Sequence, residues 1–122
     1  MKVLLGIGGS EDSIQALERT VDRVERAGDD LTVAIVENPE SELDDEAIAA
    51  KVEEVLEREG VEAPVRHVTG HAGSRIVEIA EDESFDQIVL GGGHQSPMGK
   101  IRIGHIAEFV LLNSRVTVTL IR

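Results

Sequence analysis

Residues 1–36 read MKVLLGIGGSEDSIQALERTVDRVERAGDDLTVAIV, and this stretch by itself indicates the fold class. The continuous apolar run at residues 3–7 is typical of a strand that is buried on both faces. After Ser10, a residue suited to begin a helix, apolar residues recur at helical spacing as far as Gly28. A second apolar run occupies residues 31–36. We therefore predict a strand, a helix and a strand, with a right-handed crossover that makes the two strands parallel.

The same alternation continues to the end of the 122-residue chain. A weaker apolar pattern at 65–69 predicts a strand near a sheet edge, and further strands are expected at 87–90 and 116–121. Helices are expected around Ile48, Val52, Val55 and Leu56, ending at Gly60, around Ile76, Val77, Ile79 and Ala80, and around Ile106, Ala107, Val110 and Leu111. We therefore predict a single domain, residues 1–122, with an α/β fold: a doubly wound, five-stranded parallel sheet with helices on both faces.

The charge balance limits the classes of partner. The chain carries 24 acidic and 12 basic residues, a net charge of −12, and only three of the bases are lysines. The negative electrostatic field of so acidic a chain repels nucleic acid and anionic membranes, so we expect neither as a partner. The composition is typical of salt-adapted, halophilic proteins, in which screening weakens self-repulsion. An acidic binding surface is the alternative interpretation.

Two further features of the sequence bear on where in the cell the protein is located. Cysteine does not occur, which excludes disulfides and thiol nucleophiles. The first residues lack the basic segment and cleavage site of a signal peptide, and no apolar run approaches the roughly 18–20 residues of a membrane span. We therefore expect a cytoplasmic protein.

Ligands of doubly wound sheets bind outside the carboxyl ends of the strands, where the winding changes direction. The loops expected there after the first, third and fourth strands contain no Asp or Glu, and residues 87–107 lack both. That interval instead contains His94, Lys100, Arg102 and His105. Glycine-rich, acid-free loops in so acidic a chain favour an anion site, to which backbone N–H groups and a helix N-terminus would contribute. The alternative is that acids simply follow the exposed faces of helices.

A longer motif spans this interval. Residues 89–94 read VLGGGH and are followed, after nine more residues, by GHIAE at 104–108. This spacing resembles the signature of the universal stress protein family, whose nucleotide-binding members carry Gly-x-x-Gly, nine residues, and then Gly-Ser or Gly-Thr. Residues 9–13, GSEDS, resemble the helix entry of that family. The resemblance implies a Rossmann-like, adenine nucleotide α-hydrolase-like sheet with strand order 3-2-1-4-5.

The resemblance also implies where ATP or AMP would bind. It places Gly91 against the ribose, Gly104 with the backbone of residues 105 and 106 around the phosphates, and Ile35 against the adenine. The chain departs from the pattern at Gly8, where ATP-binding members usually carry an acid, and at His94 and His105. The full candidate set is Gly8, Gly9, Ile35, Gly91, Gly92, Gly93, His94, Lys100, Gly104, His105 and Ile106.

Catalysis and metal binding have less support. No G-x-S-x-G or P-loop lysine motif occurs, so no catalytic residue is assigned. His71, His94 and His105 could together supply three nitrogens, but they lack the short spacings of common metal ligands, and we expect no metal.

The leading hypothesis is a universal-stress-type domain that binds an adenine nucleotide, or another small anion, in a stress-response or regulatory role. The alternative is a dimeric interaction module of the same family, and a slow nucleotide hydrolase is less favoured. The alternating residues 116–121 offer an exposed edge, and we expect a homodimer through this strand.

Overall fold

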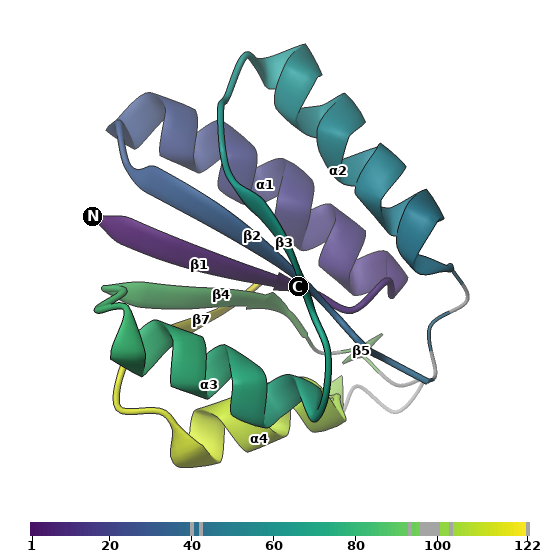
Figure 1. The fold of residues 1–122 in the computed structure, drawn as a ribbon, viewed down its shortest axis with the longest axis vertical. Helices are drawn as coiled ribbons and strands as arrows, with labels where there is room; N and C mark the ends of the chain where they lie inside the picture. The colour runs from purple at the N-terminus through teal and green to yellow at the C-terminus, as the bar shows by residue number, and fades with distance from the viewer. Residues whose placement is uncertain (40, 42, 93, 96–100, 103, 122) are drawn as a thin grey trace.

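The computed structural model of the chain describes residues 1–39, 41, 43–92, 94–95, 101–102 and 104–121, with only the backbone at 94–95 and 101–102. Seven strands and four helices occur within this part of the chain, and they alternate except where β4, β5 and β6 follow one another (Figure 1). They are β1 (Lys2–Ile7), α1 (Glu11–Ala27), β2 (Asp30–Val36), α2 (Asp45–Glu59), β3 (Val65–Val68), α3 (Ala72–Asp82), β4 (Gln87–Gly91), β5 (His94–Gln95), β6 (Ile101–Arg102), α4 (His105–Asn113) and β7 (Thr117–Ile121).

Five of the strands form one parallel sheet in the order β3-β2-β1-β4-β7. With the five expected strands numbered along the chain, this is the predicted order 3-2-1-4-5, which is therefore confirmed. The predicted edge position of β3 is also confirmed. The remaining two strands, β5 and β6, pair antiparallel as a separate small sheet. Sequence reasoning treated this whole segment as a loop, because two-residue strands leave no periodic signal.

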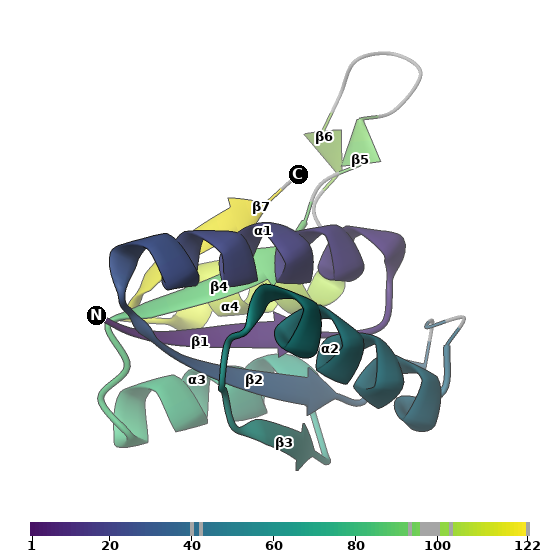
Figure 2. The same ribbon diagram turned by 90° about the horizontal axis from the view of Figure 1, so that it is seen from above.

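The sheet is covered on both faces, α1 and α2 lying on one side and α3 and α4 on the other (Figure 2). Alternate residues of the strands therefore enter two separate cores. In β1, Leu5 packs into the core with α1 and α2, and Leu4 into the core with α3 and α4. Both side chains are fully buried, which is why the central strands read as continuous apolar runs.

Local chemistry determines where the two long helices begin and end. The Ser13 N–H donates to the Ser10 side chain at the start of α1, and the Ala47 N–H donates to the Asp44 side chain at the start of α2. Gly28 and Gly60 end these helices with φ of 71° and 67°, a left-handed conformation that glycine adopts without a side-chain clash. The predicted starts and stops at Ser10, Gly28 and Gly60 are confirmed. Within the described part of the chain, no helix is both long and apolar enough to cross a membrane.

Candidate functional site

The sheet changes its winding direction between β1 and β4, because the chain adds β2 and β3 on one side of β1 and β4 and β7 on the other. A cavity of about 320 Å³ opens outside the carboxyl ends of these strands. This is the position at which doubly wound sheets bind their ligands. We call it the first cavity, and it is lined by Gly6, Gly8, Ser10, Asp12, Ser13, Val36, Asn38, Ile76, Leu90, Gly91, Gly92, Gly104, His105, Ile106 and Ala107.

Two helices begin at the first cavity. At α1 the free N–H groups are partly used, because the Ser13 N–H donates to Ser10 Oγ at 3.2 Å. At α4 the capping residue is Gly104, which has no side chain to accept from the N–H groups of the first turn. The first N–H groups of a helix have no acceptor within the helix, and they form the positive end of its dipole. The beginning of α4 therefore offers the first cavity a set of donors suited to an anion.

Gly91 lets the end of β4 approach α1 closely. A Cβ at this position would lie 2.5 Å from the carbonyl carbon of Asp12 and 2.6 Å from the backbone N of Ser13. Ordinary carbon contacts are about 3.5–4.0 Å, so only glycine allows this approach. Since Asp12 and Ser13 also line the first cavity, Gly91 brings the wall formed by β4 against the wall formed by α1.

A side-chain amide from the loop after β2 binds the backbone just beyond the carboxyl end of β1. The side-chain amide of Asn38 donates to the backbone carbonyl of Gly8 at 3.0 Å. A Cβ on Gly8 would lie 3.3 Å from that amide nitrogen and 3.4 Å from Cδ1 of Ile106, so a larger residue would press on both. The loop after β2 and the start of α4 thus meet at Gly8.

Asp12 is an acidic residue in the lining of the first cavity that sequence reasoning missed. The loops were expected to leave this edge without acids, but the first turn of α1 also reaches it. The signal was available in principle, because Asp12 follows the helix start at Ser10 by two residues. Ser10, Ser13 and Asn38 were missed in the same way, since the start of α1 and the loop after β2 are separate segments that only the fold brings together.

A second cavity of about 490 Å³ adjoins the first and shares Asn38, His105 and Ile106 with it. Its other lining residues are Glu37, Pro39, Gly70, His71, Ala72 and Gly73. A hydrogen bond joins two of the lining segments: the Gly70 N–H, after β3, donates to the carboxylate of Glu37, after β2, at 3.2 Å. The space is therefore bounded by one carboxylate and two imidazoles in an otherwise small or apolar lining.

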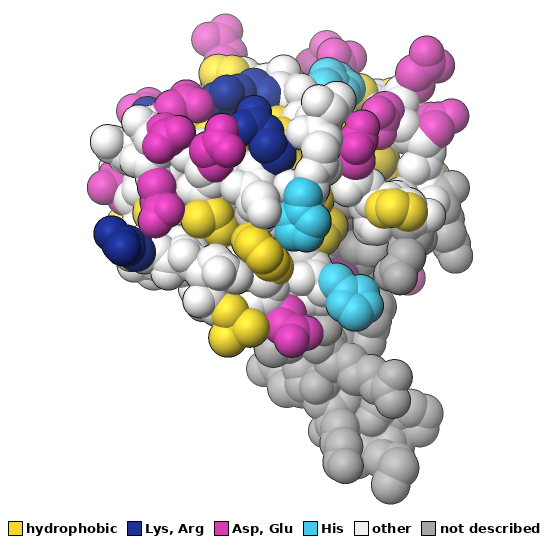
Figure 3. All heavy atoms as spheres, turned by 60° about the horizontal axis from the view of Figure 1, so that its bottom comes forward, with side chains coloured by type: hydrophobic (Ala, Val, Ile, Leu, Met, Phe, Trp, Pro, Cys, Tyr) yellow, Lys and Arg dark blue, Asp and Glu magenta, His cyan; other side chains and the backbone are white. Residues whose placement is uncertain are grey.

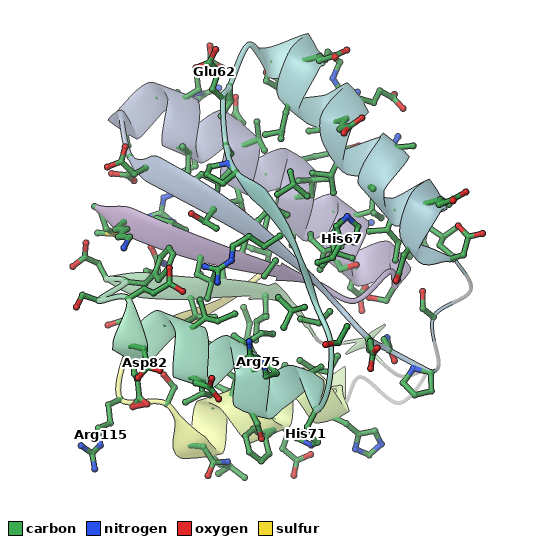
Figure 4. All side chains as sticks on the ribbon, in the orientation of Figure 1. Glu62, His67, His71, Arg75, Asp82 and Arg115 are labelled. Carbon is green, nitrogen blue, oxygen red and sulfur yellow. The ribbon has the colours of Figure 1, made fainter. Side chains whose placement is uncertain are left out.

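His71 has a defined structural role beside this second cavity. Its Nδ1 accepts from the Ser74 N–H at 3.1 Å, which caps the start of α3, and its ring meets that of Phe109 edge-on with centroids 4.8 Å apart. Figure 4 places His71 at the beginning of α3, next to α4. Figure 3, which turns this side of the molecule forward, shows histidine side chains spaced apart on the surface rather than gathered in one cluster.

The structure brings six of the predicted site residues together. Gly8, Gly91, Gly92, Gly104, His105 and Ile106 all line the first cavity. Gly9 lies outside its lining, in a turn with φ of 82° whose Cβ position faces Ser41 and Ile48. Gly93 and Lys100 lie outside the described residues, and of His94 only the backbone, in β5, is described.

Ile35 points away from the first cavity. It is 1% exposed and packs in the core with α1 and α2, while the next residue, Val36, lines the cavity. Side chains alternate between the two faces of a strand, so neighbouring residues cannot occupy the same environment. The side chain that β2 presents to the first cavity is that of Val36.

The metal hypothesis concerned His71, His94 and His105. Among the residues that the structure describes, no group of three or more His, Cys, Asp or Glu side chains could hold a metal ion. The side chain of His94 is not among them.

Comparison with known proteins agrees with this arrangement. The model of the universal stress protein family matches residues 1–122, the whole chain. The chain belongs to the universal stress protein family.

Two curated relatives support this assignment. The chain is 27% identical over 122 residues to a universal stress protein from Methanocaldococcus jannaschii, and the match covers 98% of this chain and 64% of that protein. It is 32% identical over 95 residues to one from Synechocystis sp., a match that covers 76% of this chain and 33% of that protein. The chain thus spans just under two thirds of the length of the first of these curated relatives and about one third of the length of the second.

Solved universal stress proteins share the fold. One from Archaeoglobus fulgidus superposes with a TM-score of 0.75 at 21% identity, covering 100% of this chain and 98% of that one. Another structure from Archaeoglobus fulgidus, in complex with dAMP, gives 0.71 at 18% identity and the same coverage. A universal stress protein in complex with cAMP gives 0.70 at 22% identity, covering 98% and 94%.

Proposed function

We propose that this universal stress protein domain binds an adenine nucleotide in the first cavity, in a stress-response or regulatory role. The observation that carries the proposal is the beginning of α4, where Gly104 leaves the first N–H groups without a side-chain acceptor beside a cavity at the switch point of the sheet. Relatives of the same fold have been solved with dAMP and with cAMP, which favours an adenine nucleotide over other anions.

Each part of the nucleotide is assigned to lining residues of the first cavity whose chemistry suits it. The phosphate lies at the start of α4, where N–H groups and the helix dipole favour a negative charge. The ribose lies along Gly91 and Gly92, and Asp12 accepts a hydrogen bond from a ribose hydroxyl in place of the acid missing at Gly8. The base packs on the apolar side chains of Val36 and Ile106. The contact between the adenine and Ile35 remains a prediction from the family resemblance.

These walls favour AMP over ATP. The carboxylate of Asp12 shares the first cavity with the phosphate site, so each additional phosphate charge brings more repulsion. The exposed ring of His105 stands where other family members offer a small hydroxyl. We therefore expect AMP or a cyclic monophosphate to bind more tightly than ATP.

The test replaces Gly104. In Gly104→Asp, the new carboxylate would accept from the N–H groups at the start of α4 and would repel a phosphate, while aspartate remains a favoured helix cap. A Cβ at Gly104 meets no atom within 4 Å, so the substitution introduces no clash. Gly104→Ala is the matched control, because it adds the Cβ without the acceptor.

Calorimetric titration with AMP should show binding weakened by at least about tenfold in Gly104→Asp, since a hydrogen bond to a charged group contributes about 1.5–3 kcal/mol. The Gly104→Ala variant should stay within a few-fold of the parent. Equal affinity of the parent and Gly104→Asp for AMP would show that the phosphate does not lie at α4. A parent that binds neither AMP, cAMP nor ATP would contradict the proposal as a whole.

A homodimer through β7 is the second proposal. This strand is an edge of the sheet, and its side chains are half-buried rather than fully covered, from Val118 to Ile121. On the adjoining helix α4, Leu111 is 41% and Leu112 77% exposed. Pairing two β7 strands would satisfy their free backbone groups and would cover part of this apolar surface.

A further inference from the structure

A third, smaller cavity lies between α1 and the strands β1, β4 and β7. Its volume is about 90 Å³, and it shares no lining residue with the first cavity. The lining residues are Val3, Arg19, Thr20, Arg23, Val24, Asp29, Gln87, Val89, Thr119 and Ile121. Its lining residues come from α1 and from the strands β1, β4 and β7, of which β7 is an edge of the sheet. Figure 2 shows α1 lying across the sheet near these strands.

The charge of this third cavity differs from that of the rest of the molecule. Arg19 and Arg23 are one helical turn apart on α1, and both contribute to the lining. The one carboxylate in the lining, Asp29, pairs with the N-terminal amine at 3.2 Å. Two arginines therefore line a space in which the one acid among the described lining residues is paired with the N-terminal amine.

Arg23 and Arg115 differ from several other arginines of this acidic chain. Four others lie within 4.0 Å of carboxylates: Arg26 with Asp22, Arg58 with Glu18 and Glu59, Arg66 with Glu83, and Arg75 with Glu78. Arg23 has no carboxylate partner within the described part of the chain, although acids outnumber bases by 24 to 12. Its charge is available to a ligand.

A buried hydroxyl lies beneath the two arginines. Thr20 is 4% exposed, it lines the third cavity, and its Oγ1 has no hydrogen-bond partner among the residues that the structure describes. A buried hydroxyl without a partner costs free energy, so native structures normally supply an acceptor or a donor. On the opposite wall, Gln87 Nε2 donates to Thr119 Oγ1, which leaves that hydroxyl's own proton free to donate.

We propose that the third cavity binds one phosphate-sized oxyanion. Its volume equals about three water molecules at roughly 30 Å³ each, which is room for a single such group. The guanidinium group of Arg23 binds the oxygens, Arg19 adds a second positive charge to the lining, and the hydroxyl of Thr20 donates to the anion. The bound anion would join α1 to the edge strand β7. The ligand is either free phosphate or the terminal phosphate of a larger molecule that extends along β7.

The experiment follows the backbone amides of Thr20 and Thr119 by NMR while inorganic phosphate is added, at the lowest KCl concentration that retains the fold. The parent protein should show saturable shifts at both amides. Arg23→Gln should weaken phosphate binding by at least about tenfold, because it removes a charge-assisted contact. Arg26→Gln is the matched control: it removes the same charge from the same helix, but Arg26 pairs with Asp22 and does not line the third cavity.

The same titration separates this proposal from the nucleotide site. In the Gly104→Asp background, phosphate should still shift Thr20 and Thr119, since the first and third cavities share no residue. Titration with AMP and with adenosine then distinguishes the sources: shifts of both amides with AMP but not with adenosine indicate a phosphate on a larger molecule. Shifts with inorganic phosphate alone indicate the free ion. Equal weakening in Arg23→Gln and Arg26→Gln, or no saturable shift at Thr20 and Thr119, would overturn the proposal.

Discussion

Replacing Gly91 by alanine should destabilise the fold and the first cavity together. The added Cβ would lie 2.5 Å from the carbonyl carbon of Asp12 and 2.6 Å from the backbone N of Ser13. Carbon atoms in contact are normally at least about 3.5 Å apart, so the end of β4 and the first turn of α1 must separate by about 1 Å. Both obstacles are backbone atoms, which cannot rotate away as a side chain could.

The expected loss is about 2 kcal/mol. Overpacking a well-packed interior costs roughly 1–3 kcal/mol, and a clash with backbone atoms belongs at the upper end of that range. The reduced freedom of the unfolded chain returns about 0.4–1 kcal/mol when glycine becomes alanine. Gly91 is not one of the described glycines with positive φ, so the loss comes from the contact rather than from backbone strain. A loss of this size reduces the ratio of folded to unfolded protein by about thirtyfold.

Urea denaturation measures this loss directly, and Gly92→Ala is the control. A Cβ at Gly92 would meet Cδ2 of Leu120 at 3.2 Å, and the end of a leucine side chain can shift by a few tenths of an ångström. We expect Gly92→Ala to stay within about 0.5 kcal/mol of the parent, with equal m-values for all three proteins. Equal stability of Gly91→Ala and Gly92→Ala would refute the reasoning, because the contact with α1 would then not be close.

Four further outcomes are expected. Ser10→Ala should lower the free energy of unfolding by about 1 kcal/mol in urea, because the Ser13 N–H loses its acceptor; an unchanged value would show that water replaces the cap at no cost. His105→Ser should bind AMP up to about tenfold more tightly in calorimetry, because a compact hydroxyl replaces the exposed ring, and weaker binding would mean that the ring contacts the nucleotide. Raising KCl from a low concentration to about 1 M should raise the melting temperature, because screening reduces the repulsion of a net charge of −12; a constant value would count against this. Sedimentation in molar KCl should give a species of twice the 13.2 kDa chain mass, and a monomer at all micromolar concentrations would exclude the dimer.

Much of the fold was predictable because its determinants are local. Apolar runs indicated the strands of the parallel sheet, and the residues flanking α1 and α2 indicated where these helices begin and end. Ser10 caps α1 through the N–H of Ser13, three residues later, and Gly28 ends the same helix through its own backbone conformation. Interactions of this kind involve residues within one turn of each other, so they are visible in the sequence.

The glycine positions of the site were predictable only in part. The spacing from Gly91 to Gly104 indicated a loop between a strand and a helix, and both residues line the first cavity. The reason for Gly91 was not visible, because its neighbour is the backbone of α1, far away in the sequence. Asp12 was missed for the same reason, since nothing local shows that the first turn of α1 faces the loop after β4.

The amino-acid sequence by itself determined the order of strands and helices, the ends of α1 and α2, and the place of the glycine-rich segment after β4. Only the tertiary structure decided which side chains meet. It directs Ile35 into the core and Val36 into the first cavity, and it places Arg23 and Thr119 around the third. The physical reason is that the direction of a side chain depends on the register of its strand, where one residue reverses the face. Contacts between distant segments in turn depend on the packing of α1 and α4 against the sheet.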